Sequence, residues 1–513
     1  MHFRPGRRPQ SFHPGRDRKA VRHQPPAPAP RADGALGEVV VVGGGIAGLA
    51  AATGLAERGV RVTLVEAQPQ LGGRVRAWPV HLTDGSKATM SRGFHAFFRQ
   101  YYTLRALLRR ADPALRHLVP AGDYPLLAGD GTRDSFTNIP RTPPWSVLGF
   151  VLASPSFTAR ELARVNVPAA LELLRVRFPR TFSDYDGVSA ADFLDRLRFP
   201  ARARHLSLEV FARSFFADPH DFSAGELVAM FHTYFMGSAE GLPFDVPDDD
   251  YDTALWAPLG GYLRGLGVDL RTGTTVSSLE PDPDGSGRLR VRGERLDVSC
   301  DAVVLATDRP AMQRLVAQAE WLGSGTRWRE GVASGAMAPA FAVWRGWFDR
   351  PVAAGSPAFL ATSGRGPLDN VSVLERFEAG AAAWARRTGG SVVELHAYAL
   401  PEETRTEELV SALLAELYAI HPELRDARIV DHRLLVQDDC PLVGVDPWAD
   451  RPGVDTPDER VVLAGDGVRC PLPVALMERA AVTGFQAANS LLTRHGLPGH
   501  DLWTVPMHGL LAR

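Results

Sequence analysis

The sequence predicts an α/β protein organised around a Rossmann-like strand–helix–strand unit near its start. Residues 39–42 are four valines in a row, which favours a buried parallel strand. A glycine-rich turn, a helix of small residues over 46–58 and a second strand over 60–65 follow in order. Because strand, turn, helix and strand all occur in sequence, the pattern predicts a dinucleotide-binding domain.

The turn between the first strand and the helix has the spacing G-x-G-x-x-G. Gly43 permits a sharp turn, and Gly45 lets the backbone approach a pyrophosphate. Gly48 allows the helix to pack closely against the strand. The first N–H groups of the helix, near Ile46 and Ala47, are expected to face the negative charge of the ligand.

An acidic residue and a second glycine pair define the type of dinucleotide. Glu66 ends the second strand, beside Ala67, where a carboxylate can hold ribose hydroxyls. Gly72, Gly73 and Arg74 follow, and this arrangement resembles the FAD-binding pattern of the amine oxidase and carotenoid desaturase superfamily. The resemblance implies FAD as cofactor, with Arg74 facing the pyrophosphate.

Composition limits the other possibilities. The chain has 513 residues, 45% of them apolar and 23% charged, which is typical of a soluble protein with more than one domain. A net charge of −2 does not indicate a protein that binds nucleic acids. Cys300, Cys440 and Cys470 lack ligand spacing, so we expect no metal site and a reducing, cytoplasmic environment.

The first 34 residues differ from the rest of the chain. They hold eight arginine or lysine residues, two aspartates and seven prolines, with few aliphatic side chains. Such a segment cannot bury much apolar surface, so residues 1–34 are expected to form a disordered basic arm. Two interpretations are open, an electrostatic arm for anionic lipid and a misassigned start of translation.

A narrower resemblance begins at residue 91 with the phrase SRGFHAFFRQYY. Its glycine, histidine and phenylalanines resemble the segment after the second glycine pair in plant and cyanobacterial carotene desaturases. There the segment passes near flavin and substrate, which implies roles for Gly93 and Phe94 in the site. His95 is a candidate catalytic residue, although a packed structural histidine is an equal alternative.

The family pattern returns in two later segments. A strand over 274–279 resembles the return to the FAD domain, which places the backbone of Val276 at the adenine. A buried strand over 301–307 contains Ala306. Further on, Gly465 and Asp466 end a strand, and the resemblance implies that the aspartate binds the ribitol.

A helix beginning near residue 476 completes the predicted cofactor site. Its positive N-terminus would face the flavin ring, with Met477 beside it. Glu478, in the first turn, is a candidate for proton transfer or a simple partner of the helix dipole. Amine oxidases commonly use a downstream lysine, and no lysine follows Lys87, which argues against amine oxidation.

Residues 140–180 combine an apolar run with six arginines and two glutamates. This composition fits either a segment in a membrane interface or an ordinary helical lobe with internal apolar faces. The resemblance to carotene desaturases favours the first, since their corresponding region receives substrate from the bilayer. We therefore expect a peripheral association with the inner face of the cell membrane.

These features divide the chain into a discontinuous FAD domain and a substrate region. The FAD domain is expected over 35–98, 255–308 and 436–495, and the α+β substrate domain with its helical membrane-facing lobe over 99–254 and 309–435. Residues 496–513 are expected as a C-terminal tail.

The whole pattern most resembles the aromatic-ring carotenoid synthases of the isorenieratene synthase type. The resemblance implies an FAD-dependent oxidoreductase that turns β-ionone rings of β-carotene into aromatic φ-rings, by hydride removal with C1-to-C2 methyl migration. The alternatives are a phytoene or ζ-carotene desaturase, another flavin oxidase such as protoporphyrinogen oxidase, and a catalytically idle flavin protein that binds carotenoid at membranes. Quinone and oxygen are both possible electron acceptors.

Overall fold

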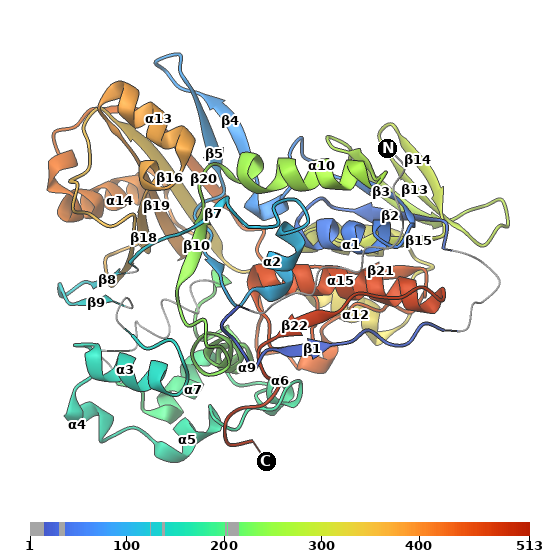
Figure 1. Ribbon diagram of the computed structural model, residues 1–513, viewed down its shortest axis with the longest axis horizontal. Helices are drawn as coiled ribbons and strands as arrows, with labels where there is room; N and C mark the ends of the chain where they lie inside the picture. The colour runs from blue at the N-terminus through green and yellow to red at the C-terminus, as the bar shows by residue number, and fades with distance from the viewer. Residues whose placement is uncertain are drawn as a thin grey trace.

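Two sheets stand at opposite ends of the molecule, with helices packed around and between them (Figure 1). The computed structural model describes residues 15–29, 36–123, 125–135, 139–200, 203 and 215–512.

The first sheet is parallel and contains the predicted strand–helix–strand unit. Its five described strands have the order β11-β3-β2-β15-β21. Their bounds are β2 Glu38–Val42, β3 Arg61–Val65, β11 Asp269–Arg271, β15 Ala302–Leu305 and β21 Val461–Leu463. The sheet thus draws strands from all three segments assigned to the FAD domain, and the α/β fold class is confirmed.

The valine run of β2 is buried because both faces of the sheet are covered. Val39 and Val41 pack with α1 Ile46–Ala56 and α15 Leu476–Arg494, which lie side by side. Val40 packs on the opposite face. That face is covered by three antiparallel strands and one helix, which are β12 Val276–Pro281, β13 Leu289–Gly293, β14 Leu296–Cys300 and α11 Arg309–Gln318.

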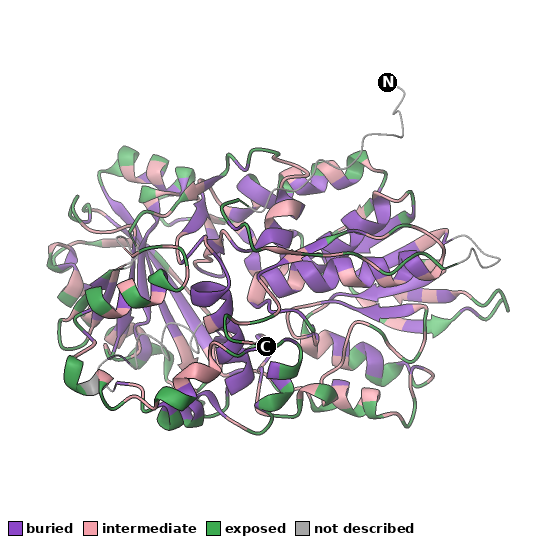
Figure 2. Cartoon of the chain, turned by 60° about the horizontal axis from the view of Figure 1, so that its bottom comes forward, coloured by how far each residue is buried: buried purple, intermediate pink, exposed green. Residues whose placement is uncertain are grey.

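The second sheet belongs to the substrate region and is antiparallel except where β17 pairs with β8. Its described strands, in spatial order, are β20 Ile429–Gln437, β16 Ala340–Phe348, β19 Ser391–Leu400, β18 Asn370–Val373, β17 Phe359–Ser363, β8 Pro125–Ala128 and β9 Arg133–Ser135. The helix α14 Thr406–Ile420 packs through its leucines on one face, and α13 Ala379–Thr388 packs around Trp347 and Trp384. Figure 2 shows the strands of both sheets largely buried.

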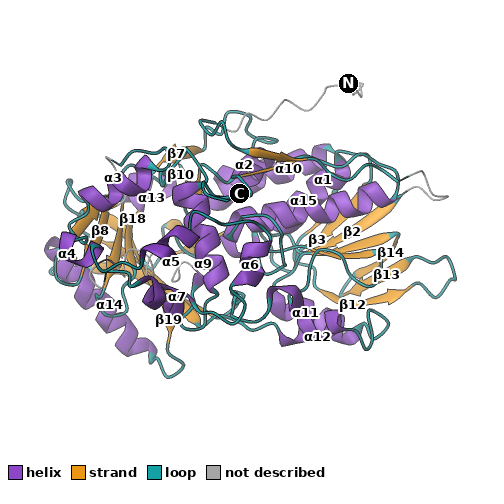
Figure 3. Ribbon diagram, turned by 90° about the horizontal axis from the view of Figure 1, so that it is seen from below, coloured by secondary structure: helices purple, strands orange, loops and turns teal. Residues whose placement is uncertain are grey.

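A lobe of short helices lies below the two sheets (Figures 1 and 3). It comprises α3 Trp145–Ala153, α4 Ala159–Leu162, α5 Val167–Glu172, α6 Arg180–Asp184, α7 Ala190–Leu197 and α9 Ala224–Phe231. Ser189 caps α7 as part of a capping box with Asp192. The sequence also predicts helix over 205–237, and the part of it over 205–214 lies outside the described residues.

The remaining elements connect these three parts. They are β4 Ala77–His81, β5 Lys87–Ser91, β6 Phe97–Phe98, α2 Tyr102–Leu108, β7 Leu118–Pro120, β10 Phe244–Pro247, α10 Ala257–Gly265 and α12 Arg327–Ser334. Among the helices of the described residues, none has the length and apolar character needed to cross a membrane.

The expectation of a disordered N-terminal arm is wrong for residues 15–29. The strand β1 Val21–His23 pairs antiparallel with β22 Leu502–Thr504, so the expected C-terminal tail is also joined to the body of the protein. Asp17 is 2% exposed and accepts a hydrogen bond of 2.6 Å from the Tyr102 hydroxyl. Backbone pairing and a buried carboxylate hold this segment, although it has few apolar side chains of its own.

Candidate cofactor and substrate site

A cavity of about 870 Å³ lies between the two sheets and receives side chains from both. Most of the residues that the sequence analysis assigned to the cofactor line it, and His95 lines it too. The assigned residues along its wall are Gly43, Gly45, Ile46, Ala47, Glu66, Ala67, Gly73, Arg74, Phe94, Val276, Ala306, Gly465, Asp466 and Met477. Gly48, Gly93 and Glu478 are not among its lining residues.

The glycine turn leaves the start of α1 open to this cavity. Gly45 is the N-cap residue, no side chain caps the helix, and its first turn has no acidic residue. The free N–H groups therefore form a site suited to a phosphate anion. Gly43 has φ +110°, and a Cβ there would lie 2.4 Å from the carbonyl oxygen of Ala306.

Gly48 acts behind the cavity rather than on its wall. A Cβ at this position would lie 1.8 Å from the carbonyl oxygen of Gly43. The glycine thus lets α1 pack directly against the turn that shapes the phosphate site. Gly48 therefore contributes to cofactor binding by positioning α1 and the turn, without contacting the cofactor site itself.

Glu66 is fixed at the edge of the cavity by two backbone groups. Its carboxylate accepts hydrogen bonds from the N–H groups of Gly44 at 2.6 Å and Gln68 at 2.7 Å. Burial raises the pKa of this carboxyl, and the two backbone bonds oppose the rise. Each carboxylate oxygen retains acceptor capacity, so a ribose hydroxyl can donate to it.

Arg74 and Asp466 meet as an ion pair on the cavity wall. Arg74 follows the second glycine pair, and Asp466 follows β21, so 392 positions of sequence separate them. A second ion pair, between Arg92 and Asp439, lines the same region. The charges at this end of the cavity suit a polar cofactor with phosphate and ribitol groups.

The cavity also has many aromatic lining residues, and some of them reach the charged groups, since Arg92 lies over the Phe341 ring. The phenylalanines among them are Phe94, Phe98, Phe216, Phe244, Phe341 and Phe359. The rings of Phe94 and Phe359 approach to 4.3 Å between centroids. This aromatic compartment can therefore hold a large apolar molecule beside the charged groups.

Gly93 brings the segment 91–98 against the second sheet. Its φ is +104°, and a Cβ there would lie 2.5 Å from the His396 ring. Gly93 therefore shapes the site by close packing and lines a smaller cavity next to the main one.

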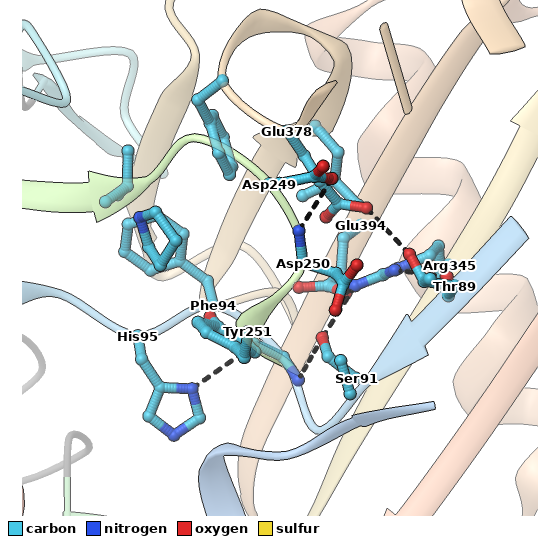
Figure 4. A pocket seen from close by; sticks show the side chains of 16 residues that line it. Thr89, Ser91, Phe94, His95, Asp249, Asp250, Tyr251, Arg345, Glu378 and Glu394 are labelled. Atoms are coloured by element: carbon cyan, nitrogen blue, oxygen red, sulfur yellow. Dashed lines mark hydrogen bonds and ion pairs between the residues drawn. The ribbon is translucent and has the colours of Figure 1, made fainter. Parts of the chain in front are cut away.

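His95 is neutral and fixed through one nitrogen. Its Nδ1 donates a 2.8 Å hydrogen bond to the carbonyl oxygen of Gly93 (Figure 4). Burial lowers the pKa of His95 to about 4, which keeps the ring neutral at physiological pH. With Nδ1 protonated, Nε2 is left as an acceptor.

Glu478 lies behind the wall of the main cavity, and its role in proton transfer stays a prediction. The side chain is buried, and its two oxygens accept hydrogen bonds of 2.8 Å from the N–H groups of Thr103 and Leu104. These are the second and third residues of α2, so the carboxyl group of Glu478 caps the first turn of that helix. Sequence reasoning located Glu478 in the first turn of α15 but could not see the second helix packed against it.

Three residues that sequence reasoning missed lie on β19. Glu394, His396 and Tyr398 occupy alternate positions, and His396 and Tyr398 line the main cavity. The available signal was the alternation of polar and apolar residues over 393–398. Because residues 393–398 also contain aromatic and apolar side chains, they indicate by themselves only a strand of the core.

The parallel sheet, the open helix N-terminus, the carboxylate at Glu66 and the adjoining aromatic compartment define a dinucleotide-dependent oxidoreductase. Comparison with known proteins agrees with this class. Residues 46–492 match the family of flavin containing amine oxidoreductases. A cyclohexylamine oxidase from Brevibacterium oxydans has a similar structure, with a TM-score of 0.63 over 89% of this chain and 99% of that one, at 14% identity.

Two relatives define the group more narrowly. The carotenoid phi-ring synthase of Streptomyces griseus is 55% identical over 96% of this chain and 95% of its own length. That of Chlorobaculum tepidum is 28% identical over 93% of this chain and 91% of its own. The chain belongs to the flavin containing amine oxidoreductases and, among them, to the group of these carotenoid phi-ring synthases. It is an FAD-dependent oxidoreductase, and the phosphate site at α1 with Glu66 beside it fits that cofactor.

Proposed function

We propose that this protein converts the β-ionone rings of β-carotene into aromatic φ-rings, by hydride removal with migration of one methyl group from C1 to C2. The observation that carries the proposal is the 55% identity, along 96% of the chain, to the carotenoid phi-ring synthase of Streptomyces griseus. The aromatic compartment beside the cofactor site supports it, because a carotenoid end group is large and apolar.

We assign the cofactor and the substrate to different parts of one cavity. We assign the pyrophosphate to the N-terminus of α1 and the adenosine ribose to Glu66. Arg74 and Asp466 would hold the central part of FAD, with the backbone near Met477 at the flavin ring. The phenylalanines would position the ring of the substrate and exclude water from it.

The proposed chemistry conserves carbon and removes four hydrogens from each ring. Bound FAD supplies the acceptor for hydride. Loss of hydride leaves a ring cation, a methyl group moves with its electron pair from the quaternary C1 to C2, and loss of a proton restores the double bond. Two hydrides and two protons leave for each aromatic ring, and the terminal electron acceptor would be a quinone or oxygen.

Pigment analysis tests this proposal. The chain is expressed in cells that accumulate β-carotene, and the carotenoids are separated by chromatography and weighed by mass spectrometry. Products with unchanged carbon count and four fewer hydrogens per converted ring are expected. Unchanged β-carotene, with conversion only in cells that accumulate phytoene or ζ-carotene, would instead assign the chain to the desaturases.

A flavin protein without catalytic activity is the third outcome. Purified protein is mixed with each of these carotenoids under anaerobic conditions. If its bound FAD keeps its absorbance with all of them, no carotenoid reduces the flavin, and this result would support that assignment. Protoporphyrinogen in the same assay tests the remaining oxidase alternative.

We also propose that the helical lobe binds the inner face of the cell membrane, where carotenoid is dissolved. Helix α3 exposes Trp145 at 61%, Leu148 at 48% and Leu152 at 76%, although such side chains are usually buried. The exposed Val167 of α5 and Leu511 near the C-terminus belong to the same lobe, since the N–H of Leu511 bonds to Leu174. Arginines at 175, 177 and 180 lie beside Leu511, together with Asp184, which pairs with Arg180. The surface stays net basic and is suited to anionic headgroups.

Sedimentation with anionic liposomes tests the membrane proposal. The double variant Trp145→Ser with Leu152→Ser is expected to weaken binding at least about tenfold, because two apolar anchors are removed. Val436→Ser is the matched control, since Val436 is 42% exposed but lies on β20 of the second sheet. Equal sedimentation of the double variant and wild type would contradict the assigned surface.

A further inference from the structure

The strand β19 presents two different faces to the protein. Val393, Leu395 and Ala397 pack in the apolar core beneath α14. Glu394, His396 and Tyr398 alternate with them and so occupy the opposite face, toward the main cavity. A row of polar groups on a buried strand is costly unless every member is bonded, so its bonding pattern is informative.

The three side chains form one continuous chain of hydrogen bonds. Tyr398 Oη lies 2.6 Å from His396 Nδ1, and His396 Nε2 lies 2.8 Å from Glu394 Oε1. A carboxylate only accepts, so Nε2 carries the proton and Nδ1 accepts from the tyrosine hydroxyl. Asn370 Nδ2 donates to Tyr398 Oη at 3.0 Å, which orients that hydroxyl.

The surroundings of His396 serve both neutral forms of its ring. When Nε2 is protonated, Glu394 accepts its proton. When Nδ1 is protonated instead, the N–H of Phe94, which lies 3.3 Å from Nε2, can donate to that nitrogen. A ring with suitable partners in both tautomers can take a proton on one side and release it on the other.

Glu394 connects this chain to a second, smaller cavity (Figure 4). Its other oxygen accepts from Arg345, from Nη2 at 2.6 Å and Nε at 2.9 Å. The cavity has a volume of about 20 Å³, enough for one water molecule, and is lined by Tyr251, Glu378 and Asp250. Glu378 is buried, and Asp250 is partly exposed.

We propose that Tyr398, His396 and Glu394 form the proton relay of the aromatising reaction, and that the small cavity beside Glu394 is its outlet toward Glu378 and Asp250. This inference rests on the proposed function, because that reaction must release two protons from each ring inside the cavity between the two sheets. The substrate end of the relay is Tyr398, whose side chain lines the main cavity.

The proton passes from the substrate ring through the relay to the outlet. The C–H bond of the ring cation breaks, and its electron pair remains in the ring as the new double bond. The proton goes to Tyr398 Oη while the original hydroxyl proton passes to His396 Nδ1. The resulting imidazolium is held against the Glu394 carboxylate, and its Nε2 proton leaves through Glu394 and a water molecule in the outlet to Glu378.

His95 is the competing proton acceptor in the same cavity. Its Nδ1 is bonded to the backbone carbonyl of Gly93, which cannot carry a proton onward. His396 instead continues through Glu394 to a second carboxylate. The relay therefore provides both an acceptor and an exit.

The test uses the purified full chain with FAD bound and β-carotene in liposomes. Tyr398→Phe keeps the ring but removes the relaying hydroxyl, so kcat for aromatic product should fall about 100-fold or more, with KM and FAD content unchanged. Solvent deuterium should slow the wild type, because the relay protons exchange with water, and this isotope effect should shrink in Tyr398→Phe. His396→Gln is expected to show the same loss.

Tyr262→Phe is the matched control. Its hydroxyl also donates to a carboxylate, Glu57, but lies outside both cavities, so wild-type kcat is expected. Undiminished kcat in Tyr398→Phe and His396→Gln, with a loss confined to His95→Gln, would overturn the relay in favour of His95. A wild-type enzyme that forms no aromatic ring would instead overturn the proposed function, and the relay with it.

Discussion

The two sheets build their parts of the site by opposite means. At the carboxyl end of β2 the chain uses backbone groups, since the start of α1 offers N–H donors and glycines keep side chains away. On β19 the chain uses side chains, placed at every second position of one strand. A backbone site tolerates many residue types but no added bulk, whereas a side-chain site depends on residue identity and strand register.

The two regions also bury charge differently. Glu66 is held by two backbone N–H groups, one in the glycine turn after β2 and one two residues further along its own turn. Glu394 relies on side chains, those of Arg345 on β16 and of His396 two residues along β19, which lower its pKa although burial alone would raise it. Substitutions at the first sheet should therefore act through packing and cofactor affinity, and those at the second through ionisation.

Gly48→Val should have the largest effect. The new Cβ would meet the carbonyl oxygen of Gly43 at 1.8 Å, so α1 must move away from the turn. We expect a loss of about 4 kcal/mol in unfolding free energy, together with loss of FAD, as measured by thermal denaturation and flavin absorbance.

Gly261→Ala is the matched control for this comparison. Gly261 lies in α10 of the same domain, and a Cβ there has no atom within 4 Å. Because alanine favours helix, this variant should be more stable by about 0.5–1 kcal/mol. Similar behaviour of the two variants would contradict the role given to close packing at Gly48.

Glu66→Ala should have the next largest effect. It removes the carboxylate that would hold the ribose, and it leaves the N–H groups of Gly44 and Gln68 without that acceptor. We expect FAD affinity to fall about 100-fold, or about 3 kcal/mol, in titrations of the apoprotein. Asp466→Ala should lose FAD as well, because it unpairs Arg74 at the cavity.

An exposed acid of the same sheet provides the control for Glu66. Asp269 lies in β11, is exposed and pairs with its neighbour Arg271. Asp269→Ala should retain stoichiometric FAD. Full flavin occupancy in Glu66→Ala and Asp466→Ala would refute the site assignment.

The contrast between the sheets also explains how much the sequence predicted. The strand–helix–strand unit was predictable because its turn, glycines and terminal acid lie within one short segment, whose packing is local. The approach of Asp466 to Arg74 was anticipated only through the resemblance to a family. No local rule brings together residues 392 positions apart.

What could not be predicted depends on pairing between distant strands. Glu394, His396 and Tyr398 become a relay only because β19 packs its apolar alternates under α14. Residues 15–29 were expected to be disordered because composition does not reveal a partner. Their strand is completed by β22, and His23 bonds to Thr504 across 481 positions.

Glu378→Gln should have the smallest of the three effects, and it tests ionisation beside the second sheet, at the residue that precedes α13. Glu378 is buried beside Glu394, and burial raises its pKa to about 7, against an ordinary value of 4.5. Between these values the folded protein keeps a proton that the unfolded chain releases, so this group lowers stability as pH rises from 4.5 to 7. Below pH 4.5 the cost is absent, and above pH 7 it is complete.

Glutamine retains the size of the side chain and the acceptor for the Thr89 hydroxyl, but it cannot ionise. The variant should therefore match wild type at pH 4 and exceed its unfolding free energy by about 2 kcal/mol at pH 6. Denaturant unfolding at both pH values measures the difference, and comparison with wild type removes the contribution of all other titrating groups. Parallel pH profiles for the two proteins would mean that Glu378 ionises in the fold as readily as in water, and the second sheet would then share the insensitivity to ionisation expected of the first.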